Sequence, residues 1–137
     1  MRSVIQQSII LPAAPDELFS AYLDSAIHAA FTVAPVTIGP NPGDAFSAFN
    51  GQLSGTMLAT IRPRLIVQSW RSVMFKPDDP DSTLILHFSP AASDPTGQAQ
   101  GQIDLVHLDV PEHDFQGVTE GWPRFYWTPW KAYLQRP

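Results

Sequence analysis

The chain has 137 residues, enough for one domain with a substantial core, which we expect to span residues 1–137. Its formal net charge is −5 and it holds only 8 Lys and Arg, so a basic surface for nucleic acid or an anionic membrane is not expected. It contains no cysteine, which excludes disulfides and thiolate chemistry. No segment resembles a signal peptide or a membrane span. We therefore expect a cytoplasmic protein without a cofactor.

The first quarter of the chain predicts one strand followed by two short helices. Apolar and β-branched residues run over 4–11 and end at Pro12, as in a strand. Pro15 and the two acidic residues after it are typical of the first turn of a helix. A second short helix is expected over residues 24–31.

The middle of the chain predicts about six strands with short connections. Asn50-Gly51 marks a hairpin, because both residues tolerate the positive φ that such a turn needs. Gly55, inside a strand, is interpreted as a bulge. Strands joined by hairpins form an antiparallel sheet, so the fold class is α+β. The six expected strands cover residues 33–38, 45–49, 53–61, 65–74, 83–88 and 103–110.

The end of the chain holds a dense aromatic segment, residues 121–134. Read at about 100° per residue, it forms a helix with one broad apolar side. Such a side must pack on an equally apolar surface, which we expect to be the concave face of the sheet, with a hollow between sheet and helix. The apolar side holds Phe115, Val118, Trp122, Tyr126, Pro129 and Tyr133, flanked by Phe125 and Trp130, and the polar side holds Glu120, Arg124, Thr128, Lys131 and Gln135.

Two prolines interrupt this helix. Pro123 and Pro129 each lack a backbone donor, which favours a kink and leaves the carbonyls of Thr119 and Phe125 without helical partners. The bend either lets the helix follow the sheet or tunes access to the hollow.

The last hairpin allows a prediction of register. If its loop is centred near Pro95, His87 lies opposite Asp104 on the solvent side, and a slip of one residue would bury that carboxylate. The inward-facing pairs are then Leu84 with His107, Leu86 with Leu105, and Phe88 with Ile103.

His107 is thus the one polar side chain on an otherwise apolar inner wall. It is either a core histidine satisfied by a backbone carbonyl or a hydroxyl, or a hydrogen-bonding group at a ligand pocket. The other histidines, His28, His87 and His113, lie on different elements, so no metal site is expected.

Large rings make up most of the remaining candidate wall. Trp70 and Arg71 lie on opposite faces of one strand, and Trp70 is expected inward because burying an indole is more favourable. Plain core packing explains each ring singly, whereas their collective excess around a curved sheet favours a pocket. The candidate ligand-binding residues are Phe46, Trp70, Leu84, Leu86, His107, Trp122, Phe125 and Tyr126.

Eight segments of the chain match a known pattern: residues 14–22, 42–46, 50–55, 66–71, 106–107, 110–111, 121–122 and 126–134. Their order and spacing resemble the START/SRPBCC superfamily, which has the helix-grip fold of the birch-pollen allergen. More narrowly, they resemble its AHSA branch, homologues of the C-terminal domain of the activator of heat-shock-protein ATPase. The chain departs from the common pattern at Asn50, where aspartate often precedes the glycine, and at Pro123, where a polar residue is usual.

This resemblance implies a curved antiparallel sheet of about 6–7 strands around a long C-terminal helix, and an apolar small-molecule ligand between them. The leading hypothesis is ligand binding without catalysis. An enzyme of hydrolase or cyclase type would use His107, with Asp109 or Arg71 nearby, but no catalytic triad or pair of inward carboxylates can be placed. The third hypothesis is a stress or chaperone accessory protein. The low charge also permits a homodimer.

Overall fold

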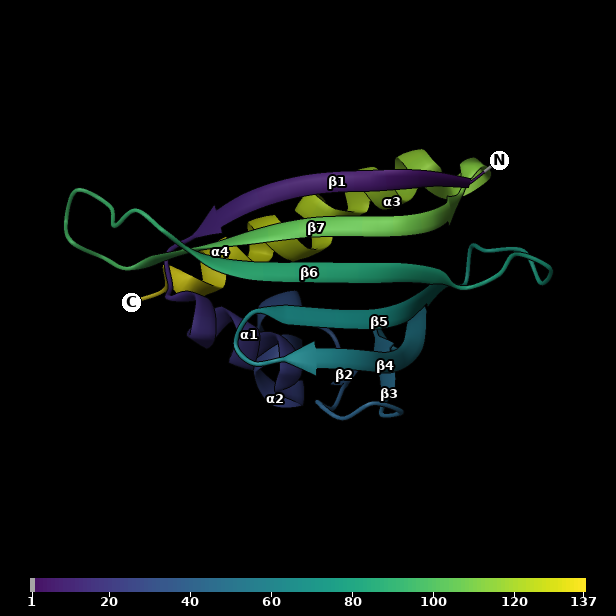
Figure 1. The fold of residues 1–137 in the computed structure, drawn as a ribbon, viewed down its shortest axis with the longest axis horizontal. Helices are drawn as coiled ribbons and strands as arrows, with labels where there is room; N and C mark the ends of the chain where they lie inside the picture. The colour runs from purple at the N-terminus through teal and green to yellow at the C-terminus, as the bar shows by residue number, and fades with distance from the viewer. Residues whose placement is uncertain (1) are drawn as a thin grey trace.

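The computed structural model describes residues 2–137, which form a seven-stranded antiparallel sheet wrapped around a long C-terminal helix (Figure 1). The strand order is β1-β7-β6-β5-β4-β3-β2, so the first and last strands are neighbours and all other neighbours are consecutive in the chain. The strands are β1 (Arg2–Leu11), β2 (Val36–Thr37), β3 (Ala45–Ala48), β4 (Leu53–Ile61), β5 (Leu65–Ser72), β6 (Ser82–Ala91) and β7 (Gln100–Pro111).

The helices cover one face of this sheet. In Figure 1 the C-terminal helix lies behind β1 and β7, and the two short helices lie behind the lower left part of the sheet. This arrangement confirms the predicted helix-grip fold. The helices are α1 (Pro15–Leu23), α2 (Ser25–Thr32), the 3-10 turn η1 (Glu112–Asp114), α3 (Phe115–Trp122), the π-helical turn η2 (Pro123–Trp127) and α4 (Thr128–Leu134).

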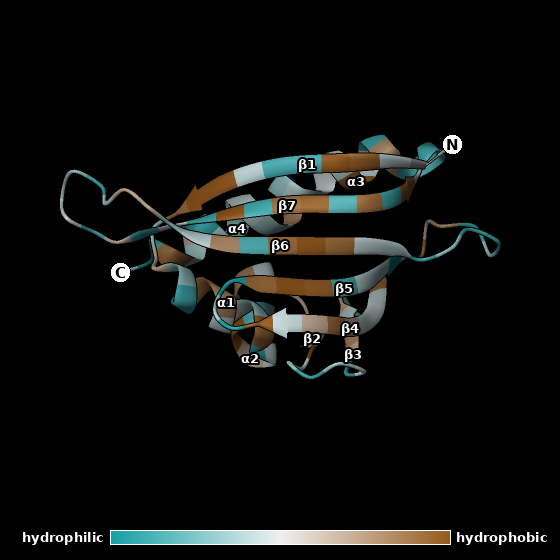
Figure 2. Cartoon of the chain, viewed as in Figure 1, coloured by the Kyte–Doolittle hydropathy of each residue, from teal (hydrophilic) through white to brown (hydrophobic). Residues whose placement is uncertain are grey.

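The predicted register of the last hairpin is confirmed. His87 lies opposite Asp104, and the inward pairs on β6 and β7 are the three that the sequence predicts. Trp70 also faces inward, because buried and partly buried residues alternate along β5 and Trp70 belongs to the buried set. The side chains that these strands turn toward the helix are apolar apart from a few polar groups, and apolar residues run along the middle of β5, β6 and β7 (Figure 2).

Two local predictions for the first hairpins need correction. Residues 33–38 do not form a full strand, since only Val36–Thr37 pairs with β3. The bulge in β4 lies between Met57 and Ala59 and not at Gly55. Gly55 instead permits a close approach of two backbones, because a Cβ there would lie 1.9 Å from the carbonyl oxygen of Ser69.

Residue 33 caps α2 in a conformation that a β-branched side chain disfavours. Val33 has φ 57° and ψ 40° and is 86% exposed. In the left-handed region a Cβ costs roughly 1–2 kcal/mol, and glycine is the usual residue at this position after a helix.

Replacing Val33 with glycine is therefore expected to stabilise the protein by about 1 kcal/mol, as measured by urea unfolding. The control is Val73→Gly, another exposed valine in a turn but not at positive φ, which should not stabilise. Equal effects of the two substitutions would contradict the conformational explanation.

The C-terminal helix contains a π-helical turn at its first proline. The N–H of Thr128 donates to the carbonyl of Pro123, so this turn holds one more residue than an α-helical turn. The extra residue shifts the helical phase of the residues that follow it. Trp127 is buried beside Trp130, whereas simple 3.6-residue spacing does not place Trp127 on the apolar side. The five residues predicted on the polar side are exposed.

The carbonyl that Pro123 leaves free has found a partner. Gln7 on β1 donates its Nε2 to the oxygen of Thr119 at 2.9 Å, and its Oε1 accepts from the indole Nε1 of Trp127 at 2.8 Å. One glutamine therefore satisfies both groups that the proline and the π turn displace. It also fixes the middle of the helix to the edge strand.

Candidate functional site

A pocket of about 540 Å³ lies between the first half of the C-terminal helix and the sheet. The helix contributes one wall, and the end of β5 and the turn between β3 and β4 contribute the others. The lining residues are Ala34, Phe49, Asn50, Gln52, Leu53, Trp70, Ser72, Met74, Asp114, Gly117, Val118, Gly121, Trp122, Phe125 and Tyr126.

The helical wall has open space because two of its residues have no side chain. Gly117 and Gly121 are four positions apart, so both lie on the side of α3 that faces the pocket. A Cβ at Gly121 would meet only the ring of Phe125, at ordinary contact distances of 3.6 and 4.0 Å. Glycine inside a helix costs about 1 kcal/mol relative to alanine. The pocket thus lies beside two helical positions that carry no side chain.

The other lining groups are mostly aromatic. Phe49 packs edge-on against Phe125 with ring centroids 5.7 Å apart, and Trp122 lies 4.9 Å from Tyr126. Trp70 completes this ring of aromatics at 6.0 Å from Trp122. Rings that hold each other in this way give the pocket rigid apolar walls.

The structure divides the candidate ligand-binding residues into two groups. Trp70, Trp122, Phe125 and Tyr126 line the pocket. Phe125 is the most exposed of these, at 47%. The other four candidates are buried in the core and do not line the pocket; they are Phe46, Leu84, Leu86 and His107.

Several lining residues were missed by sequence reasoning. Phe49, Asn50 and Gln52 come from a turn whose hairpin signal says nothing about where the turn points. Asp114 lies just before the first residue predicted on the apolar side of the helix. Gly117 and Gly121 have no side chain that an apolar pattern could include. The spacing of Gly117 and Gly121 was the one available signal, since two glycines on one side of a helix indicate either close packing or open space.

His107 is a core histidine bonded to a hydroxyl and an indole. Ser82 Oγ donates to the backbone carbonyl of Trp70 at 2.6 Å, so it accepts from His107 Nε2 at 2.8 Å. His107 Nδ1 then accepts from the indole Nε1 of Trp122 at 3.2 Å. Burial lowers the pKa of His107 to about 3, which keeps the ring neutral. This chain of bonds ties β5, β6 and β7 to α3.

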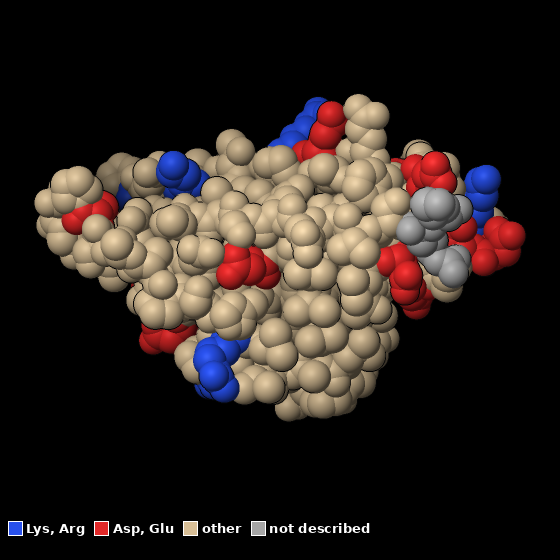
Figure 3. All heavy atoms as spheres, turned by 45° about the horizontal axis from the view of Figure 1, so that its top comes forward, with Lys and Arg blue, Asp and Glu red and all other residues tan. Residues whose placement is uncertain are grey.

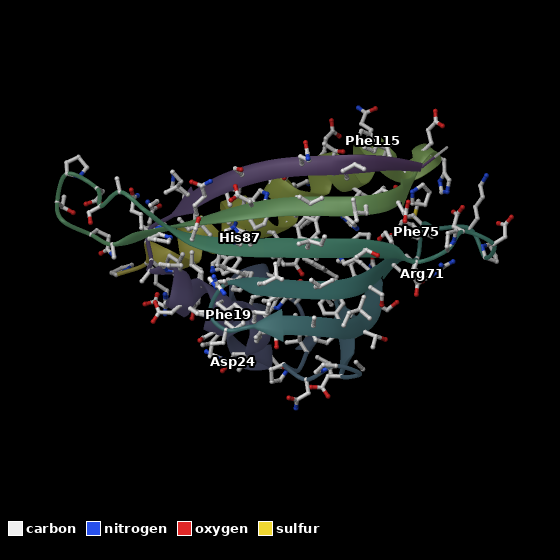
Figure 4. The ribbon with its side chains drawn as sticks, in the orientation of Figure 1. Phe19, Asp24, Arg71, Phe75, His87 and Phe115 are labelled. Atoms are coloured by element: carbon white, nitrogen blue, oxygen red, sulfur yellow. The ribbon has the colours of Figure 1, made fainter. Side chains whose placement is uncertain are left out.

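The bonds of His107 provide no acid–base partner. Neither Asp109 nor Arg71 is bonded to it among the described residues. Arg71 instead holds the loop after β5, where it donates to the carbonyls of Asp79 and Lys76 and lies over the ring of Phe75. Figure 4 shows Arg71 and Phe75 together at that end of the molecule.

A second buried histidine supports the pocket from behind. His28 Nδ1 lies 2.8 Å from the carbonyl of Tyr22, which can only accept, so this nitrogen carries the proton. Its Nε2 therefore accepts from the hydroxyl of Tyr126 at 2.9 Å. Burial lowers the pKa of His28 to about 4. The network fixes Tyr126, whose ring lines the pocket.

The polar groups of the pocket are few. Asn50 and Gln52 are exposed, and Ser72 Oγ accepts from the backbone N–H of Met74 at 3.1 Å. Asp114 is the one lining residue that carries a charge at neutral pH. Across residues 2–137 no group of three potential ligands is placed to hold a metal ion.

A curved antiparallel sheet that grips a long C-terminal helix, with a pocket between the two, defines a helix-grip protein of the START/SRPBCC type. Residues 12–135 match the family described as Activator of Hsp90 ATPase homolog 1-like protein. The chain belongs to this family. In the described part of the chain, no helix is both long and apolar enough to span a membrane.

Among similar proteins, the human Activator of 90 kDa heat shock protein ATPase homolog 1 is 27% identical over 112 residues, which are 82% of this chain and 31% of the human protein. This chain thus spans less than a third of that relative. A crystal structure of an HSP90 activator from Plasmodium falciparum superposes with a TM-score of 0.83 at 18% identity and covers 98% of this chain and 97% of its own. The crystal structure of CalU16 from Micromonospora echinospora superposes with a TM-score of 0.73 at 19% identity. The match covers 98% of this chain and 83% of the CalU16 chain. These two likenesses show the shared fold.

Proposed function

We propose that this chain binds an apolar small molecule in the pocket between α3, β5 and the β3–β4 turn. The observation that carries the proposal is the pocket itself, which is about 540 Å³ in volume and lined mainly by aromatic and aliphatic side chains. Small-molecule sites commonly occupy about 300–1,000 Å³ and combine apolar walls with a few polar groups. Removing apolar surface from water, at roughly 25 cal/mol per Å², would drive binding.

We expect four of the predicted site residues to contact the ligand directly: Trp70, Trp122, Phe125 and Tyr126. Phe46, Leu84, Leu86 and His107 would act behind them, as the core on which the aromatic wall rests. Catalysis by His107 is not part of the proposal, because this ring is neutral, buried and bonded to Ser82 and Trp122.

Filling the pocket tests the proposal directly. Gly121→Leu would place a side chain in the open space on α3, and we expect the affinity for the neutral fluorescent probe N-phenyl-1-naphthylamine to fall at least about tenfold, a loss of about 1.4 kcal/mol. Folding should be preserved, because leucine is the better helix former by about 0.8 kcal/mol. Probe fluorescence gives the affinity, and urea unfolding gives the stability.

The matched control is Ala132→Leu, which adds the same side chain on the exposed side of α4. It should leave probe affinity unchanged. If the wild-type protein binds neither this probe nor other apolar compounds of any charge, or if Gly121→Leu binds them equally well, the pocket is not a ligand site.

A second candidate function is suggested by the names of the relatives. The matching family and the human relative are both described as activators of an Hsp90 ATPase, so this chain would assist a chaperone of that kind. The ATPase rate of Hsp90 with and without the chain distinguishes the two candidates, because ligand binding alone predicts no change. The cytoplasmic location and the homodimer remain predictions.

A further inference from the structure

One carboxylate stands in an otherwise uncharged aromatic pocket. Asp114 lines the pocket, and no hydrogen bond from a described residue reaches its side chain. It is the residue before α3, yet it makes no capping hydrogen bond to the helix. Partial burial raises the pKa of its carboxyl, which reflects the cost of keeping this charge away from water.

The position of the carboxylate is also known. Its Oδ1 lies 3.0 Å from the point that a Cβ on Gly117 would occupy. Gly117 is itself a lining residue, so this oxygen lies beside the open helical wall. A side chain at position 117 would crowd this oxygen, so the glycine allows the carboxylate to lie against the helical wall.

The aromatic walls suit a positive charge. Cations are attracted to the faces of tryptophan, tyrosine and phenylalanine rings, and sites for organic ammonium groups commonly combine such rings. Five lining residues are aromatic: Phe49, Trp70, Trp122, Phe125 and Tyr126.

The wider charge distribution has the same sign as Asp114. Acidic side chains gather at the end of the molecule that carries the β5–β6 loop, at the right in Figure 3. Arg71 and Lys76 belong to the same region, but the pocket lining contains neither of them, nor any other Lys or Arg. The chain as a whole has a net charge of −5. The acidic residues in and beside this loop and at the end of β7 are Asp78, Asp79, Asp81, Asp109 and Glu112.

We propose that the pocket selects apolar organic cations, with the ammonium group of an amine ligand paired to Asp114 and its hydrocarbon part held among the aromatic rings. This inference rests on the proposed function and adds the chemical class of the ligand. A fatty acid or another anionic amphiphile would meet repulsion from Asp114 without a lysine or arginine in the lining to offset it. A neutral ligand would cover the partly buried carboxylate without offering it an opposite charge.

Three probes of nearly equal shape test the charge preference. 1-Naphthylmethylamine is a cation at pH 7, 1-naphthylmethanol is neutral and 1-naphthoate is an anion. Calorimetric titration of the wild-type protein at low salt is expected to show the amine binding roughly tenfold more tightly than the alcohol, because a hydrogen bond to a charged group is worth more than a neutral one. The carboxylate should bind most weakly. Raising the salt concentration should lower the affinity for the amine and leave the affinity for the alcohol unchanged.

The variant Asp114→Asn should bring the amine to within about twofold of the alcohol, without changing the affinity for the alcohol. Asparagine is as good a residue as aspartate before a helix, so folding should be retained. The matched control is Asp109→Asn, which removes the same charge five residues away, from a side chain that does not line the pocket. This control should keep the preference for the amine.

The outcomes separate the two proposals. If all three probes bind equally, or the carboxylate binds best, the charge preference is wrong while small-molecule binding stands. If Asp109→Asn and Asp114→Asn lower the amine affinity by the same factor, the preference comes from the general field and the pairing with Asp114 is wrong. If none of the probes binds, both proposals fail.

Discussion

Lowering the pH from 7 to 4.5 is expected to reduce the free energy of unfolding by about 5 kcal/mol, because two histidines are buried in their neutral form. Burial lowers the pKa of His28 to about 4 and that of His107 to about 3. In the unfolded chain both titrate near 6.5. Below that pH the unfolded state binds protons that the folded state refuses, so stability falls. Each histidine contributes about 2–3 kcal/mol at pH 4.5.

The hydrogen bonds explain why the folded state resists these protons. A proton on His107 Nδ1 would face the indole N–H of Trp122, and a proton on His28 Nε2 would force the hydroxyl of Tyr126 to turn. The aspartates with lowered pKa values lose their stabilising effect only below about pH 4, so they act outside this window.

Urea unfolding at pH 7, 6, 5 and 4.5 measures the effect. The variant His107→Gln is expected to be less stable at pH 7 but to lose only about half as much stability on acidification. The control His87→Gln removes an exposed histidine and leaves both buried histidines in place, so most of the loss of stability on acidification should remain. A stability that stays constant from pH 7 to 4.5 would contradict the neutral buried histidines.

Replacing Trp130 with alanine is expected to cost about 3–5 kcal/mol, which is a large share of the 5–15 kcal/mol that holds a domain together. Trp130 is fully buried and stacks on Phe31, with ring centroids 4.2 Å apart and planes at 2°. It also lies 6.4 Å from Trp127 in a nearly parallel orientation. Its loss would leave a cavity between α2 and α4, where the end of the C-terminal helix packs against the core.

The variant Trp130→Phe separates volume from hydrogen bonding. The indole Nε1 of Trp130 is buried without a hydrogen-bond partner, so phenylalanine loses ring volume but no bond. We expect it to cost about 1–2 kcal/mol, well below the alanine variant. Unfolding free energies from urea titration check both values, and a cost below about 1.5 kcal/mol for Trp130→Ala would show that the site collapses to fill the space.

The sequence by itself determined the order of the elements, the antiparallel sheet and the register of the last hairpin. These features depend on local alternation and turn chemistry, which are visible in residues such as His87 and Asp104. It also determined that Pro123 would free the carbonyl of Thr119. Four of the pocket residues could be found in the same way, because large rings on inward positions of known elements are few.

Only the tertiary structure decided where the open space lies. The pocket depends on Gly117 and Gly121 meeting the end of β5 and a turn that is distant in the chain, and no local pattern records a gap between segments. The π-helical turn is another example, since Trp127 is buried there and donates to Gln7 on a distant strand, a contact that no local pattern predicts. The position of Asp114 in the pocket lining is likewise visible only in the tertiary structure. Local spacing specifies which face a side chain occupies, whereas cavities arise from how faces fail to fill the space between them.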